Sequence, residues 1–124
     1  MASANGAHSN WSESGGEMRA EAQDKYAELL EQNRAQAMAM CIREAGKTIP
    51  DALAEVREAV DFARYYAQRA RIDFTASIRL PVPTGEDNTI ALASRGVFAC
   101  ISPWNFLLAI FSARYWRHSL RATR

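Results

Sequence analysis

Apolar residues recur at helical spacing through the first third of the chain. Between about residues 18 and 45 they lie three or four positions apart, or at sums of these distances: Tyr26, Leu29, Leu30, Ala37, Met40 and Cys41. This spacing predicts one helix with a single buried stripe. Gly46 is expected to end the helix, because glycine adopts the left-handed cap conformation without a side-chain penalty.

A second helix is expected over residues 50–71. Thr48 and Asp51 have the spacing of a capping box, with aspartate in place of glutamate, and Pro50 lies in the first turn, where its missing N–H costs little. The apolar line of this helix is Leu53, Val56, Val60, Ala63, Ala67 and Ala70. We predict that the two helices pack antiparallel. The shared core is expected to contain Leu30, Cys41, Val56 and Val60.

The pattern changes after the second helix. Residues 80–88 hold two prolines and a turn cluster, which is typical of a linker. Residues 89–93 predict a strand, Arg95 and Gly96 a turn, and the apolar run 97–101 a buried strand. A further helix is expected from near Trp104. Helices followed by two strands and a helix indicate the opening of an α/β dinucleotide-binding domain.

Composition narrows the class of protein. The chain has 124 residues, of which 48% are hydrophobic, as expected of a globular domain. Cys41 and Cys100 both lie in apolar surroundings, so we expect unreactive thiols and a reducing, cytoplasmic compartment. No stretch has the composition of a membrane span or a secretory signal. Residues 1–17 lack an apolar period and are expected to form a flexible N-terminal segment.

Asn105 is the residue best suited to chemistry. It follows the strand expected at 97–101, and the carboxyl ends of such strands are where α/β sheets bind ligands. An amide N–H held there can stabilise a developing oxyanion. The structural alternative is a turn in which the Trp104 indole packs.

Two other candidate sites fail on the residues themselves. Gly46-Lys47-Thr48 has the ending of a phosphate-binding loop, but position 41 is Cys41 rather than glycine, and a helix rather than a strand leads in. Lys47 is therefore expected in solvent or near the last helical carbonyls. His8 and His118 have no metal-like spacing with the cysteines, so we expect no metal site.

Two segments carry a resemblance to a known family. Residues 101–106, Ile-Ser-Pro-Trp-Asn-Phe, resemble the strand-to-loop motif of the aldehyde dehydrogenase superfamily, and residues 43–48 with the helix over 51–62 extend the match. Together they are similar to the L-glutamate γ-semialdehyde (Δ1-pyrroline-5-carboxylate) dehydrogenase module of bifunctional proline-utilisation flavoenzymes. The resemblance covers roughly residues 11–111. It departs at Leu107, where the family usually has proline.

The resemblance implies a fold and a reaction. The fold class is α/β, a helical hairpin followed by the first strands of an aldehyde-dehydrogenase-type NAD-binding domain, here incomplete. The implied parent enzyme is a homo-oligomer that uses NAD to oxidise a small-molecule aldehyde, glutamate γ-semialdehyde, to glutamate in proline catabolism. Asn105 matches the amide of the oxyanion hole. The segment that lines the NAD cleft is matched by Ile101, Ser102, Pro103, Trp104 and Asn105.

Other functional residues of the family have no counterpart in the sequence. The cysteine nucleophile, the glutamate base and the lysine that holds the adenosine ribose lie further along such enzymes. We therefore expect this chain alone to be inactive and to lack measurable NAD affinity. The family also has a tryptophan near Trp11 that packs beneath the first helix.

The composition changes again at residue 112. Residues 112–124 contain four arginines and no acidic residue, and these arginines account for the formal net charge of +1. In one plausible set of codons, a one-base shift near Phe111 restores a family-like continuation. We therefore interpret residues 18–111 as a partial aldehyde dehydrogenase domain and residues 112–124 as an out-of-frame tail.

The alternative function is a small helical interaction module. Its basic face would consist of Arg114, Arg117, Arg121 and Arg124, at separations of three, four and three. So few charges neutralise few phosphates, and binding of this kind is lost at physiological salt. We therefore expect no nucleic-acid partner and no membrane span.

Overall fold

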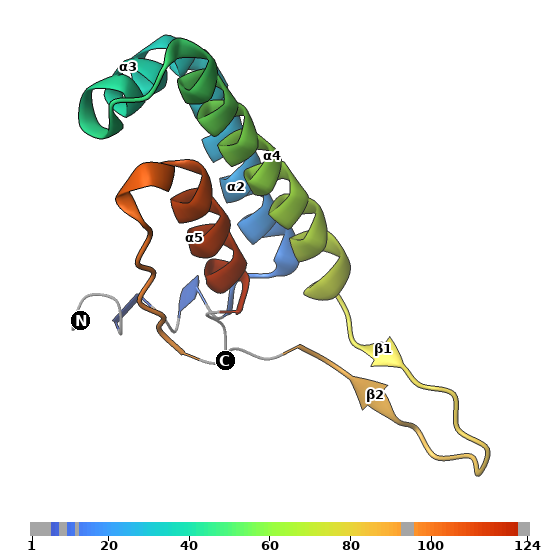
Figure 1. The fold of residues 1–124 in the computed structure, drawn as a ribbon. Helices are drawn as coiled ribbons and strands as arrows, with labels where there is room; N and C mark the ends of the chain where they lie inside the picture. The colour runs from blue at the N-terminus through green and yellow to red at the C-terminus, as the bar shows by residue number, and fades with distance from the viewer. Residues whose placement is uncertain (1–5, 8–9, 12, 93–95, 122–124) are drawn as a thin grey trace.

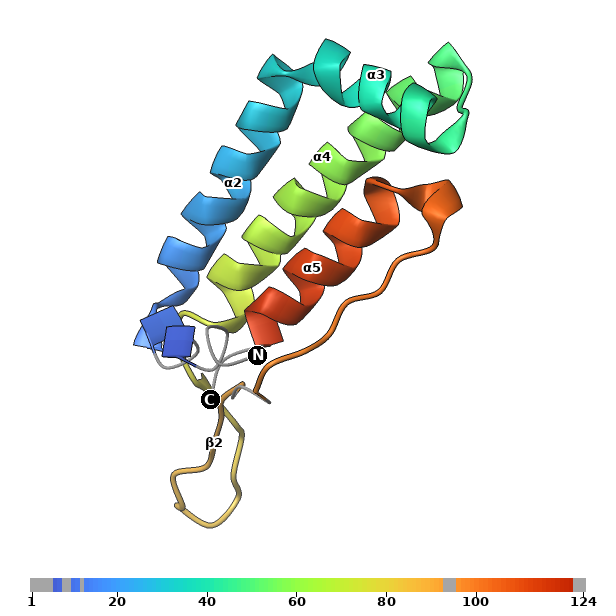
Figure 2. The same ribbon diagram turned by 90° about the vertical axis from the view of Figure 1, so that its left-hand side faces the viewer.

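The computed structural model describes residues 6–7, 10–11, 13–92 and 96–121. Its helices are α2 (Gly16–Gln32), α3 (Arg34–Ala45), α4 (Ile49–Asp73) and α5 (Ala109–Arg121). Between α4 and α5 lie the short strands β1 (Ile78–Arg79) and β2 (Thr89–Ile90) and the 3₁₀ turn η1 (Trp104–Phe106). Figure 1 shows the β1–β2 hairpin projecting away from the helices. In Figure 2, α4 lies between α2 and α5, antiparallel to α2 and parallel to α5.

The single helix expected over residues 18–45 is two helices, and that prediction was wrong at Asn33. The Asn33 side-chain amide donates to the carbonyl oxygen of Leu29 at 2.7 Å, and the backbone there has φ −102° and ψ 22°. A short polar side chain that bonds to a nearby carbonyl competes with regular helix. The chain therefore turns at Asn33, and α3 crosses the ends of α2 and α4 (Figure 2).

The helix boundaries between α3 and α4 agree with the sequence prediction. Gly46 has φ 64°, in the left-handed region, and its N–H bonds to the Ile42 carbonyl at 3.0 Å. The Thr48 hydroxyl accepts the N–H of Asp51 at 3.3 Å and donates to the Asp51 carboxylate at 2.6 Å. The helix expected over residues 50–71 is confirmed as α4.

Small side chains make up most of the fully buried positions of α2 and α4. Seven alanines of these helices are at most 1% exposed: Ala20, Ala27, Ala52, Ala59, Ala63, Ala67 and Ala70. The backbones approach so closely that a Cβ added at Gly16 would lie 2.4 Å from the carbonyl oxygen of Ala70. The predicted antiparallel hairpin is confirmed. Cys41, Val56 and Val60 are buried, and Leu30 is partly buried against the same core.

Helix α5 packs against α4 through Trp116. This indole is 8% exposed and packs with Ala27, Val60 and Ala63. Its ring centroid lies 5.2 Å from that of Tyr26, at an interplanar angle of 61°. A favourable edge-to-face aromatic contact therefore joins α2 to α5.

The predicted start of the last helix was wrong. The helix expected from near Trp104 is instead the η1 turn, and α5 begins at Ala109. The carbonyl of Leu108 accepts the N–H of Ser112 at 2.9 Å, which makes Leu108 the N-cap residue. Leu107, which stands where the family usually has proline, has α-helical angles, φ −59° and ψ −41°, without starting the α-helix.

The strand predicted at residues 97–101 is not formed, and that prediction was wrong. Val97, Phe98 and Ile101 are 49%, 41% and 78% exposed, and the residues that the structure describes there make no ladder. A buried strand needs paired edges and covered faces, and the described ranges supply only β1 and β2. These two pair antiparallel, with Ile78 opposite Ile90. Thr89–Ile90 confirms the start of the strand expected at 89–93, whereas Ala93 and Arg95 lie outside the described residues.

Candidate functional site

The five residues predicted to contact a cofactor form one continuous loop before α5. Ile101 and Trp104 are 78% and 74% exposed, and Asn105 is exposed within η1. The N–H of Phe106 donates to the Pro103 carbonyl at 3.2 Å and closes the turn. The Ser102 hydroxyl oxygen is buried and has no hydrogen-bond partner among the described residues. The loop therefore exposes an amide and an indole, and it contains a buried hydroxyl without a partner among the described residues.

Glu55 of α4 holds the C-terminal end of this loop, although the sequence analysis did not single it out. Its side chain is 3% exposed, and Oε2 accepts the N–H groups of Leu108 at 3.2 Å and Ala109 at 3.0 Å. The first N–H groups of a helix have no partner within the helix. A carboxylate at that end also favours the helix dipole. Glu55 thus caps α5 from a different helix.

Lys47 completes this arrangement, and its predicted position in solvent or near helical carbonyls was wrong. Its Nζ lies 2.8 Å from Glu55 Oε1, and its side chain is only 14% exposed. The same Nζ lies 5.1 Å from the centroid of the Phe106 ring. A sequence signal was available, because Glu55 lies three residues after Ala52 and four before Ala59, on the buried stripe of α4. A carboxylate there needs a partner.

The environment of Glu55 favours its charged form. Burial raises the pKa of the Glu55 carboxyl. The hydrogen bond from Lys47, those from the N–H groups of Ala109 and Leu108, and the positive charge of Lys47 together lower it further than burial raises it. The resulting pKa lies below the ordinary value for glutamate. Glu55 is therefore a carboxylate at neutral pH.

Cys41 has the buried character expected from the sequence, whereas Cys100 does not lie in a buried strand. Cys41 is 2% exposed, and burial, followed by the charge of Glu55, raises the pKa of its thiol. A buried thiol with a raised pKa is a poor nucleophile. Cys100 is half-buried and lines a cavity.

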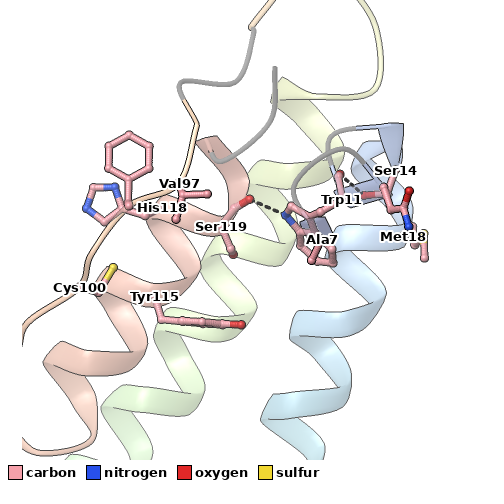
Figure 3. A pocket seen from close by; sticks show the side chains of 11 residues that line it. Ala7, Trp11, Ser14, Met18, Val97, Cys100, Tyr115, His118 and Ser119 are labelled. Atoms are coloured by element: carbon pink, nitrogen blue, oxygen red, sulfur yellow. Dashed lines mark hydrogen bonds between the residues drawn. The ribbon is translucent and has the colours of Figure 1, made fainter. Parts of the chain in front are cut away.

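That cavity, of about 480 Å³, is lined by described residues of the N-terminal segment and the start of α2, by residues of the segment 97–100 and by α5 (Figure 3). Its lining is mainly apolar and aromatic and includes Trp11, Met18, Phe98 and Tyr115. The Trp11 indole N–H donates to the Ser119 carbonyl at 2.8 Å, as Figure 3 shows. None of residues 101–105 lines this cavity. This cavity and the Asn105 loop are therefore separate features.

The N-terminal segment is attached to α2 by a buried arginine. The Arg19 guanidinium, in a side chain 3% exposed, donates to the carbonyl oxygens of Ser14 at 2.6 Å and Trp11 at 3.3 Å. It also lies 5.3 Å from the Phe74 ring centroid. Trp11, expected beneath the first helix, thus lies at the start of α2 and reaches across to α5.

The predicted basic face of the tail includes one internal contact. Arg114 donates to the carbonyl oxygen of Ile101 at 2.6 Å, so it binds the backbone at the start of the Asn105 loop. Arg117 is exposed. The side chain of Arg121 and all of Arg124 lie outside the described residues, as does His8. Among the described helices, none is long and apolar enough to cross a bilayer.

Comparison with known sequences gives one consistent set of relatives. The profile of the aldehyde dehydrogenase family matches residues 1–117. The bifunctional protein PutA of Salmonella typhimurium is 43% identical over 96 residues, which are 77% of this chain and 6% of PutA. The 1-pyrroline-5-carboxylate dehydrogenase of Anoxybacillus flavithermus is 35% identical over 112 residues, 90% of this chain and 22% of the relative. The chain thus spans only a small part of these relatives.

Solved structures agree with this result. A variant of proline utilization A from Bradyrhizobium japonicum superposes with a TM-score of 0.92 and 43% identity, over 98% of this chain and 13% of that one. A 3,6-anhydro-L-galactose dehydrogenase in complex with NAP gives a TM-score of 0.84 and 27% identity, over 98% and 25%. The helices and the small sheet therefore match one part of these larger folds.

Proposed function

The chain belongs to the aldehyde dehydrogenase family, and from this membership we propose that it is part of an NAD-dependent enzyme that oxidises L-glutamate γ-semialdehyde to glutamate in proline catabolism. The observation that carries the proposal is the loop of residues 101–105, which presents the Asn105 amide beside exposed Trp104. In this proposal the substrate is a small aldehyde, and the parent enzyme is a cytoplasmic homo-oligomer.

The residues present fit one wall of a dinucleotide site. Trp104 and Ile101 offer exposed apolar surface, and the buried Ser102 hydroxyl lacks a partner among the described residues. NAD, when bound, would supply the hydride acceptor. The Asn105 side chain would donate its N–H to the aldehyde oxygen as a thiolate attacks the carbonyl and charge develops on that oxygen.

In this proposal the chain by itself does not catalyse the reaction. The family's cysteine nucleophile and glutamate base have no counterpart in its sequence, and Cys41 is buried with a raised pKa. The purified chain should produce no NADH from the semialdehyde above background. Residues 112–124 remain, in our interpretation, an out-of-frame tail. Sequencing the codons after Phe111 tests this, because a single missing or extra base supports it and the absence of a family-like second frame contradicts it.

The decisive test of the reaction is Asn105→Ala in the full-length dehydrogenase that carries these residues. Loss of one oxyanion donor should lower the single-turnover acylation rate by roughly 10²- to 10³-fold. Asn88→Ala is the matched control, because Asn88 is exposed between β1 and β2. Its rate should be unchanged. An unchanged rate for Asn105→Ala would remove this amide from the mechanism.

A further inference from the structure

We propose that Lys47 and Glu55 are positioning residues. They fix the position of the Asn105 amide by binding the chain on its C-terminal side. This inference rests on the proposed role of Asn105. Neither residue is proposed to touch substrate or cofactor. Glu55 acts through the backbone N–H groups of Leu108 and Ala109, and Lys47 acts through Glu55 and the Phe106 ring.

Glu55 extends from a rigid part of the structure. Glu55 lies on α4 among Ala52, Val56 and Ala59, all at most 1% exposed. A side chain on a closely packed helix has little freedom to move. Its carboxylate therefore offers a fixed acceptor to the loop.

Glu55 and Lys47 contact the chain close to Asn105. Glu55 Oε2 accepts the N–H groups of Leu108 and Ala109, three and four residues beyond Asn105. Lys47 Nζ lies 5.1 Å from the ring centroid of Phe106, the next residue in the chain. A cation facing an aromatic ring attracts it. The chain that follows Asn105 is thus held at Phe106, by Lys47, and at the start of α5, by Glu55.

The N-terminal side of the loop has a second attachment. Arg114 of α5 donates to the Ile101 carbonyl at 2.6 Å. Because Glu55 fixes the N-terminus of α5, it also fixes the helix from which Arg114 extends. A shift at Glu55 would therefore reach both ends of residues 101–106. This coupling makes Glu55 a determinant of where the amide lies.

The two charges depend on each other. A buried carboxylate without a cation is strongly destabilising, and Lys47 meets that need at 2.8 Å. The titratable group that acts on Glu55 from the described part of the chain is Lys47, and Glu55 in turn raises the pKa of the nearby Cys41 thiol. From α5 it receives only backbone N–H groups. Protonation of Glu55 weakens both its ion pair and its cap, because each is stronger with a charged acceptor.

The first test uses the 124-residue chain and needs no catalysis. In Glu55→Gln, hydrogen exchange of the amides of residues 106–109 should be on the order of tenfold faster than in the unchanged chain, since charged acceptors bond more strongly than neutral ones. Amides of α2 should keep their rates. Glu58→Gln is the matched control, because Glu58 is an exposed glutamate on the same helix. Lys47→Gln should reproduce the effect, and Lys47→Arg should restore the slower exchange.

The effect of Glu55→Gln on hydrogen exchange should depend on pH in a definite direction. The folded-state pKa of Glu55 is lowered, so its contribution is present above the ordinary glutamate pKa of about 4.3 and is lost as the pH falls through the lowered value. The difference between the unchanged chain and Glu55→Gln should therefore vanish in that acidic range. A difference that persists there, equal rates at residues 106–109, or a uniform rise that includes α2 would each overturn the proposal.

The second test uses the full-length enzyme and separates positioning from general destabilisation. Glu55→Gln should lower kcat with little change in KM, and the double variant with Asn105→Ala should be no slower than Asn105→Ala alone. Independent, multiplicative losses would overturn the inference. If Asn105→Ala alone has no effect, the proposed role of Asn105 fails, whereas the exchange result in the 124-residue chain still reports whether Glu55 holds the loop.

Discussion

Two regions of this chain treat their apolar residues in opposite ways. In α2 and α4 the inward side chains are small and almost completely buried, as at Ala63 and Ala67. In residues 97–107 the apolar side chains are large and exposed, with Trp104 at 74% and Phe106 at 44%. A helix satisfies its backbone hydrogen bonds within one segment, whereas a buried strand needs other strands. The helices of the first region therefore bury their own apolar side chains, whereas the second region leaves large apolar side chains exposed.

The largest expected difference between the two regions comes from replacing a tryptophan by alanine in each of them. Trp116→Ala removes an indole that is 8% exposed in the helical core and should lower the free energy of unfolding by about 3–5 kcal/mol. Trp104→Ala removes one that is 74% exposed and should change it by no more than about 0.5 kcal/mol. Urea unfolding followed by far-UV circular dichroism measures both. Similar losses for the two variants would contradict the comparison.

The close approach of α2 and α4 gives an intermediate effect. Gly16→Ala places a methyl group 2.4 Å from the carbonyl oxygen of Ala70, a backbone atom that cannot swing away. Overpacking of this kind should lower the free energy of unfolding by about 1–3 kcal/mol. Gly15→Ala is the control, because a Cβ there meets nothing within 4 Å. Equal stability of the two variants would show that the helices separate at no cost.

The smallest effect concerns the surface of the helical region. Glu31 and Arg64 form an ion pair at 2.6 Å with side chains about half exposed. Glu31→Gln should lower the free energy of unfolding by no more than about 1 kcal/mol, and this difference should shrink in high salt. The comparison is the unchanged chain at low and high salt. A larger, salt-independent loss would mean that surface ion pairs, and not the alanine-lined core, hold α2 against α4.

Sequence patterns predicted those features whose causes are local. Gly46 ends α3 and Thr48 begins α4, because a cap depends on a few neighbouring residues. The apolar period likewise predicted the burial of Cys41, Val56 and Val60, but it was wrong for Leu29 and Met40, which are 47% and 56% exposed. The five residues of the Asn105 loop were placed together because they are consecutive.

Features that depend on distant residues were not predicted. The periodicity of residues 18–45 continues through Asn33, so it concealed the break between α2 and α3. The apolar run at 97–101 has a strand's composition, yet burial requires partners that the described residues do not supply. The pairing of Lys47 with Glu55 and the capping of α5 follow from how α4 and α5 pack. Spacing along the chain carries only a weak trace of that packing.

The bond between the Trp11 indole and the Ser119 carbonyl joins residues 108 positions apart. Closing so long a loop costs conformational entropy before the contact returns any stabilisation. Helices α2 and α4 are joined through α3 alone and meet at much lower cost. We therefore expect α2 and α4 to assemble first, during synthesis from the N-terminus. Helix α5 then packs against the assembled α2–α4 pair, and the hydrogen bond from Trp11 to Ser119 forms last.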